Sequence, residues 1–359
     1  MPSASRSMAC RAALVLGALI GFGLLMSQSA PAFIYWANTG NTIGRANLNG
    51  SSAKQDFITT TTNACGVAVT RTHIYWTTTG NAAAGTGTIG RAKRNGTAIK
   101  SNFITGLTNP CGIAVSRNHV YWANTNPAGG IGRAALSGKA STVKRTFIPT
   151  SGYACGVAVN GTHVFWGNRD DGTVGRAKLN GAVPNQAFVT AGSNICMGGV
   201  NKKHIFWTSF GSDSIGRASI NGNPSSVRQS LFSGDGPCGL ALTRTSIFWA
   251  NSGTNSIGRA KLNGTAPNAA FIPGANVPCW VAVDPPAPKC RVPNLHGKTV
   301  DASRRILRRR NCRLGQVTRG PSGSVPAGRV ASQSPAPGTK RPARTRVDVK
   351  VSTGPPARR

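Results

Sequence analysis

The stretch "ACGVAVTRTHIYW" (Ala64–Trp76) joins two short apolar segments through a polar turn, and it recurs along the chain. A tryptophan closes the second half at spacings of 40 to 46 residues: Trp36, Trp76, Trp122, Trp166, Trp207 and Trp249. After each Trp come a segment like "IGRANLNG" (43–50), an aromatic–aliphatic pair like Phe57-Ile58, and the next Cys-led run. Self-similarity at this period predicts a series of identical structural units.

Each piece of the repeat is short, rich in β-branched and aromatic residues, and bounded by Gly, Asn, Thr or Pro, which is typical of β-strands. Asn-Gly ends most of the "GRA" segments, and this dipeptide favours tight hairpin turns. Four short strands per unit predict an all-β propeller, one blade per unit. A solenoid of parallel strands is the alternative, but hairpin turns imply antiparallel neighbours.

The repeat starts and stops out of phase. It opens on "FIYW" (33–36) with no Cys-led run before it, and it ends on "PCWVAV" (278–283) with no Trp segment after it. Six Trp strands and six Cys strands are therefore offset by one. We expect Trp280–Val283 to pair beside Phe33–Trp36 and to complete the first of six blades, leaving no exposed sheet edge at the closure.

The pattern "HIYW…IGRAxLNG…PCGVAV" resembles the YWTD propeller of the low-density-lipoprotein receptor class over Phe33–Asp284. The resemblance implies a six-bladed propeller. The family's strand-end Asp is replaced by Asn, Thr or Ser at positions 38, 78, 124, 168, 209 and 251. We therefore expect the Arg of each "GRA" segment to bond amide, hydroxyl or carbonyl oxygens in place of that carboxylate.

The N-terminus predicts export. Two arginines precede an apolar run (12–26), and the small residues Ala30-Pro31-Ala32 follow it, as in a cleaved secretory signal over residues 1–32. An uncleaved anchor is the alternative, although 15 apolar residues are short for a membrane span. We expect a secreted, extracellular or cell-wall protein of a bacterium, in an oxidising compartment.

The C-terminal region (287–354) has a different composition, and it is followed by a basic tail (355–359) that we expect to be disordered. A helix is predicted from about Thr299, and "RVDVKVSTG" (346–354) alternates like a strand. The region resembles a PASTA domain through "VPNL" (292–295), Gly297, Ala302, Leu307, "VPAG" (325–328), "QSP" (333–335), "PGT" (337–339) and "VSTG" (351–354). The resemblance implies a small α+β domain that binds peptidoglycan or its fragments.

The cysteines divide into two groups. Cys290 and Cys312 flank the first strand and helix of the C-terminal region, and in an exported chain they predict a structural disulfide. The other six occupy one position of the repeat: Cys65, Cys111, Cys155, Cys196, Cys238 and Cys279. Because neighbouring sheets pack about 10 Å apart, we expect buried, structural free thiols here, with bridging between adjacent blades as the alternative.

Other candidate sites are weaker. His73, His119, His163 and His204 share one repeat position, so a scaffold role is favoured over catalysis. Asp170 and Asp171 interrupt one loop and are a weak candidate cation site, although a solvated Asp turn is the simpler interpretation. The chain has no Glu, and its eight acidic residues are all Asp. Few carboxylates are therefore present to form a paired general acid–base site. We predict no catalytic residues, no cofactor and no metal.

The charge suggests the partner. Lys and Arg number 42 and the formal net charge is +34, which favours anionic polymers; a basic composition without a specific partner is the alternative. Candidate contacts are Arg304, Arg305, Arg308, Arg309, Arg310 and Arg313. No aromatic residue interleaves with them, which disfavours nucleic acid. We expect a monomeric, non-enzymatic wall-binding protein whose propeller contacts a further protein. The alternative is a hydrolase or lyase with its site at one mouth of the propeller.

Overall fold

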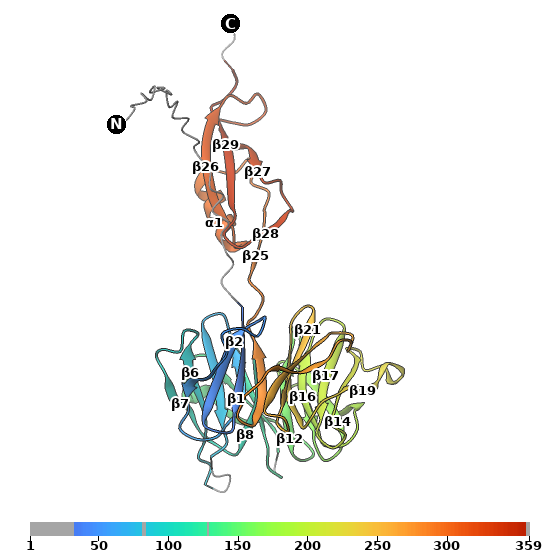
Figure 1. Ribbon diagram of the computed structural model, residues 1–359. Coiled ribbons are helices and arrows are strands. Elements are labelled where there is room, and N and C mark those ends of the chain that lie inside the picture. The colour runs from blue at the N-terminus through green and yellow to red at the C-terminus, as the bar shows by residue number, and fades with distance from the viewer. Residues whose placement is uncertain (1–31, 81–83, 128, 357–359) are drawn as a thin grey trace, which may run out of the picture. The chain divides into compact units, whose positions relative to one another are not determined.

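The computed structural model describes residues 32–80, 84–127 and 129–356, and the expected signal segment lies almost wholly outside them. The described chain forms six four-stranded antiparallel sheets and a small α+β domain (Figure 1). The inner strand of each sheet contacts the inner strand of the next, all the way round. The fold is therefore the six-bladed β-propeller that the repeat predicted, followed by a second domain.

The strands of the first three blades, from the channel outward, are β24 (Pro278–Val283), β1 (Phe33–Asn38), β2 (Thr42–Asn47) and β3 (Lys54–Thr59); β4 (Ala64–Val69), β5 (His73–Thr78), β6 (Gly87–Lys93) and β7 (Lys100–Leu107); and β8 (Pro110–Val115), β9 (His119–Asn124), β10 (Ile131–Ala135) and β11 (Lys144–Ile148).

Those of the last three blades are β12 (Ala154–Val159), β13 (His163–Asn168), β14 (Thr173–Lys178) and β15 (Asn185–Thr190); β16 (Ile195–Val200), β17 (His204–Ser209), β18 (Ser214–Ser219) and β19 (Arg228–Ser233); and β20 (Pro237–Leu242), β21 (Ser246–Asn251), β22 (Ser256–Lys261) and β23 (Asn268–Ile272). Two 3-10 turns, Ala140–Thr142 and Pro224–Ser226, precede β11 and β19.

The ring closes through strands from opposite ends of the propeller sequence. β1 pairs antiparallel with β24, with Ile34 opposite Val283 and Trp36 opposite Val281. We call β24 the latch strand. An ion pair between Arg94 and Asp284 joins the turn after β6 to the end of this strand, and Asp284 Oδ2 also accepts a bond of 2.9 Å from the Phe33 backbone N–H. The predicted closure is thus confirmed.

Apolar clusters between neighbouring sheets hold the blades together. The six repeated tryptophans are fully buried, and each indole lies over the glycine of the adjacent "GRA" strand. A Cβ added at Gly175 would lie 2.2 Å from Trp166 Cε2. Glycine is therefore required at this position so that the indole can lie flat against the neighbouring strand.

The C-terminal domain is built from α1 (Val300–Arg309), a three-stranded sheet of β26 (Arg313–Gly320), β29 (Arg346–Ser352) and β27 (Val330–Ser334), and a two-stranded sheet of β25 (Lys289–Arg291) and β28 (Lys340–Pro342). The Thr299 hydroxyl caps the helix by accepting a hydrogen bond from the Ala302 N–H. Asp301 in the first turn and Arg308 in the last turn interact favourably with the helix dipole. Its core has its own cluster, which includes Leu307, Val347 and the disulfide between Cys290 and Cys312. The disulfide predicted from the sequence is therefore present.

Candidate functional site

The basic end of the C-terminal domain is the first candidate site. Arg304, Arg305, Arg308, Arg309, Arg310 and Arg313 are all exposed, as an anion-binding role requires. Arg304 is engaged, because it donates to Asp301 Oδ1 at 2.9 Å. The last turn of α1 and the segment after it leave Arg308, Arg309, Arg310 and Arg313 on the surface, and no ion pair involves these four among the described residues.

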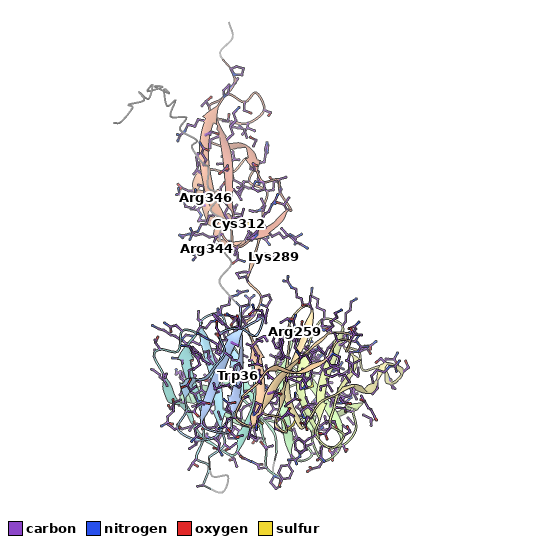
Figure 2. All side chains as sticks on the ribbon, in the orientation of Figure 1. Trp36, Arg259, Lys289, Cys312, Arg344 and Arg346 are labelled. Atoms are coloured by element: carbon purple, nitrogen blue, oxygen red, sulfur yellow. A yellow bond between two sulfur atoms is a disulfide. The ribbon has the colours of Figure 1, made fainter. Side chains whose placement is uncertain are left out.

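The fold adds two arginines that the sequence analysis missed. Arg313 lies directly beside Arg346, because β26 and β29 pair in parallel with these two residues in register. The Arg344 N–H donates to the Asn311 carbonyl at 2.7 Å, so the segment before β29 is bonded to the one after α1. Arg344 and Arg346 are both exposed on the C-terminal domain (Figure 2). The alternation of "RVDVKV" (346–351) could have indicated Arg346, since the polar positions of this strand face away from the core.

We define the basic end as Arg308, Arg309, Arg310, Arg313, Arg344 and Arg346. An open pocket of about 550 Å³ lies on it, lined by Arg313, Leu314, Gly315, Gln316 and Arg346. Asp348 lies nearby and accepts a bond of 2.6 Å from the Gln316 N–H through Oδ1. Two guanidinium groups side by side can bind carboxylate or phosphate oxygens in bidentate fashion.

One mouth of the propeller is also basic. At this latch mouth, where β24 ends, the loops that follow the inner strands carry exposed Arg71, Arg117, Lys202, Lys203 and Arg244. Inside it is an open pit of about 200 Å³, lined by aliphatic side chains of the six inner strands and by Trp280. Like charges around one opening create a local field that attracts anions.

Trp280 closes the bottom of this pit. Five of the six repeats have Gly or Met at its position, and the latch strand alone has Trp. Its indole lies against the backbone of Gly112, Gly156 and Gly239, where an added Cβ would come within 2.4 to 2.9 Å of the ring. It therefore crosses the channel and separates the pit from the opposite end, which we call the cysteine mouth.

The latch mouth contains the buried carboxyl of Asp284, whose side chain is 4% exposed. Burial raises the pKa of Asp284, while the Phe33 N–H and the Arg94 guanidinium oppose that rise. This carboxylate is therefore bonded to Phe33 and Arg94 within the closure and is not available to a ligand.

The sequence-based expectation of free thiols is wrong for four of the six repeated cysteines. Cys65 is bonded to Cys111 and Cys155 to Cys196, each pair joining the inner strands of two consecutive blades. The Cα atoms are 4.9 and 4.6 Å apart, well within disulfide range, because inner strands converge toward the channel while the sheets diverge outward. The average spacing of packed sheets does not apply at the axis.

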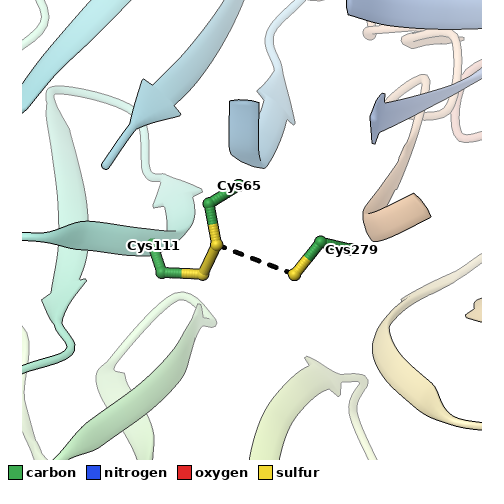
Figure 3. A group of neighbouring side chains, drawn as sticks. All are labelled: Cys65, Cys111 and Cys279. Carbon is green, nitrogen blue, oxygen red and sulfur yellow. Dashed lines mark hydrogen bonds between the residues drawn. A yellow bond between two sulfur atoms is a disulfide. The ribbon is translucent and has the colours of Figure 1, made fainter. Parts of the chain in front are cut away.

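The remaining two cysteines are free thiols in contact. Cys238 Sγ and Cys279 Sγ are 2.6 Å apart, and Cys279 Sγ also lies 3.6 Å from Cys65 Sγ (Figure 3). The contact with Cys279, together with burial, raises the pKa of Cys238, and the same contact lowers the pKa of Cys279. Among the described residues, the sulfurs of Cys65, Cys111 and Cys279 form the one cluster compact enough for a metal, and two of them are joined to each other.

The other candidates are dispersed. The rings of His73, His119, His163 and His204 each lie about 6 Å from the aromatic ring two residues on, and burial and nearby arginines lower their pKa values. Asp171 accepts a bond from the Ser151 hydroxyl. No third metal-binding side chain joins Asp170 and Asp171 within the described ranges, so a cation site there stays a weak prediction.

The repeated "GRA" arginines mostly stack on aromatic rings. The guanidinium carbon of Arg45 lies 3.8 Å from the Phe57 ring centre, and Arg176 lies 3.8 Å from that of Phe188. Arg133 combines such stacking with a bond of 3.3 Å to the Leu179 carbonyl. The expected oxygen partners are therefore largely replaced by cation–π contacts, which keep these arginines in the scaffold.

Comparison with known proteins agrees with this architecture. Residues 291–353 match the PASTA domain family. A chain of a nidogen/laminin complex superposes with a TM-score of 0.55 at 18% identity, over 70% of this chain and 98% of that one. Virginiamycin B lyase from Staphylococcus aureus gives a TM-score of 0.46 at 17% identity, over 70% and 85% of the two chains. No curated protein sequence matches significantly.

The PASTA match and the likeness to the nidogen/laminin chain establish a YWTD-type propeller fold followed by a PASTA domain. The identities are too low to transfer an activity. None of the described helices is long and apolar enough to cross a membrane.

Proposed function

We propose that this protein is a non-enzymatic component of the bacterial cell envelope that binds the wall through its PASTA domain. The basic end carries the proposal. Its six arginines are exposed, two of them, Arg313 and Arg346, line the open pocket, and peptidoglycan and the polymers attached to it carry carboxylate or phosphate groups. Paired guanidinium groups favour such oxygens over neutral sugars.

The latch mouth of the propeller supplies a second cationic surface. Its loops belong to four different blades, so a ligand there would contact several rigid supports at once. We propose that this mouth binds anionic groups of the same wall polymer and so raises retention through two linked contacts. A separate protein partner of the propeller, as first expected from the sequence, is the alternative.

Sedimentation with purified cell wall tests the proposal. The basic end is weakened by replacing Arg308, Arg309, Arg313 and Arg346 with Gln in the full chain. We expect the fraction bound at physiological salt to fall at least tenfold, because each replacement removes a charge-assisted contact of about 1 kcal/mol or more. Salt should weaken the variant's residual binding less steeply than that of the wild type, because fewer counterions are released.

A matched control removes the same charge elsewhere. Lys298, Arg319, Arg329 and Lys350 are exposed in the C-terminal domain and lie at the end of its sheet opposite Arg313 and Arg346. Replacing these four with Gln leaves the basic end intact. If both variants lose binding equally, the attraction is a property of net charge alone and the assigned site is wrong.

A further inference from the structure

The cysteine mouth contains an incomplete series of bridges. Two disulfides join consecutive inner strands, β4 to β8 and β12 to β16. The third pair, Cys238 on β20 and Cys279 on β24, is unbonded although its sulfurs are 2.6 Å apart. This pair differs from the other two in one respect: it would tie the latch strand covalently to the neighbouring blade.

Cys279 also touches an existing disulfide. Its Sγ is 3.6 Å from Cys65 Sγ, so a thiol and a disulfide lie in van der Waals contact (Figure 3). Cys65, Cys238 and Cys279 are each partly exposed. The Cys238 backbone is fixed by the Thr208 hydroxyl, which donates to the Cys238 carbonyl at 2.7 Å. Exchange requires a thiolate adjacent to a disulfide sulfur, and this arrangement provides the contact.

We propose that the cysteine mouth is a thiol–disulfide relay that moves a disulfide from Cys65–Cys111 to Cys238–Cys279 and thereby locks the latch strand. This activity is independent of wall binding. It uses four of the six inner-strand cysteines as redox-active groups rather than as packing: Cys279 and Cys238 attack in turn, Cys65 is the sulfur first attacked, and Cys111 is the leaving group.

The relay has two balanced steps. The Cys279 thiolate attacks Cys65 Sγ, a Cys65–Cys279 bond forms, and Cys111 leaves as a thiolate. Cys238 then gives up its proton and attacks Cys279 Sγ, which releases Cys65. One disulfide and two thiols are present throughout, so the transfer needs no external oxidant. Cys279 is the attacking group in the first step because it lies beside Cys65, and its contact with Cys238 lowers the pKa of its thiol.

The direction of transfer has a mechanical consequence. Cys65–Cys111 joins two blades whose strands follow each other in the chain, whereas Cys238–Cys279 fastens β24, which pairs with β1 from the other end of the propeller sequence. The second position therefore resists opening of the ring.

Disulfide mapping after trapping with N-ethylmaleimide tests the relay. The full chain is equilibrated without oxygen at pH 7.5, quenched, digested and analysed by mass spectrometry. In the wild type we expect two populations, one with Cys65–Cys111 and one with Cys238–Cys279. In Cys238→Ser the second step is blocked, so a Cys65–Cys279 crosslink should accumulate with Cys111 alkylated.

The matched control is Cys196→Ser, which frees Cys155. No third sulfur forms a compact cluster with that pair within the described residues, so Cys155 should remain an alkylated monothiol. The relay is overturned if Cys238→Ser retains only Cys65–Cys111 and an alkylated Cys279. The wild-type protein provides a test that does not depend on the folding of a variant. If mapping finds only Cys65–Cys111 in the wild type after prolonged equilibration, the relay is also overturned.

Discussion

At the scale of single residues, the blades depend on glycines that admit a buried indole. Gly175→Ala places a methyl group 2.2 Å from Trp166 Cε2, and the fully buried Trp166 has no space into which it can move. We expect a loss of about 1–3 kcal/mol in the free energy of unfolding. Urea titration followed by tryptophan fluorescence measures it.

Gly161→Ala is the matched control. Gly161 lies in the turn between β12 and β13, an added Cβ would meet nothing within 4 Å, and its φ is outside the left-handed region. We expect a change within about 0.5 kcal/mol. Equal losses in the two variants would show that backbone freedom, and not indole packing, requires the glycine.

The residue scale is also where sequence analysis was least accurate. The repeat correctly placed all six cysteines at one equivalent position, but their pairing depends on how strongly the inner strands converge, which spacing along the chain does not report. Arg344 and Arg346 were missed because their place beside Arg313 arises from a parallel strand pairing between distant segments. Trp280 was visible as the one Trp in the Cys-led runs, yet only the closed ring shows that it crosses the channel.

At the scale of elements, the latch strand is stabilised by the ion pair between Arg94 and Asp284, which has no equivalent in the other blades. Four blades have Leu at the position of Arg94, and none of the other inner strands ends in Asp. Arg94→Leu would leave the buried Asp284 carboxylate with the Phe33 N–H as its remaining bond. We expect this single change to cost about 3–5 kcal/mol, because the carboxylate is left without its cation.

The double variant Arg94→Leu, Asp284→Asn should recover most of that loss, since it restores residue types that other blades tolerate and keeps an acceptor for Phe33. Chemical denaturation of wild type, both single variants and the double variant gives the coupling energy. Additive losses would mean that the ion pair does not fasten the latch.

The repeated histidines predict a pH dependence of the propeller. Burial lowers the pKa values of His73, His119, His163 and His204 below the 6.5 of the unfolded chain, so unfolding takes up protons. Their contribution to stability is present above pH 6.5 and is lost as the pH falls through the lowered folded values. The urea midpoint should therefore be lower at pH 5.5 than at pH 7.5, and His163→Gln should show a smaller difference. A midpoint that rises on acidification would contradict this assignment.

The closure itself could be predicted because it rests on counting: six Trp strands and six Cys strands, offset by one, leave a single consistent pairing. The strand order within each blade could be predicted from the hairpin turns, because strands that are consecutive in the chain are also neighbours in the sheet. The offset between Trp and Cys strands then predicts which two strands from the ends of the propeller sequence pair with each other.

At the scale of the whole molecule, the two domains have separate cores. The apolar clusters of the propeller contain residues between Phe33 and Val283, and that of the PASTA domain contains residues from Cys290 to Val351. The segment between β24 and β25 is rich in proline and belongs to neither. Domains with their own cores unfold as separate cooperative units unless a large interface couples them.

Scanning calorimetry should therefore resolve two transitions, and Cys290→Ser, Cys312→Ser should shift one of them. The bridge spans 22 residues, so its removal should cost the PASTA domain about 3 kcal/mol through the larger entropy of its unfolded chain. The propeller transition should keep its midpoint in this variant, and it should move in Cys155→Ser, Cys196→Ser, which leaves the PASTA domain untouched. A parallel shift of both transitions in either variant would show that the domains unfold as one unit, and the basic end would then owe part of its stability to the propeller.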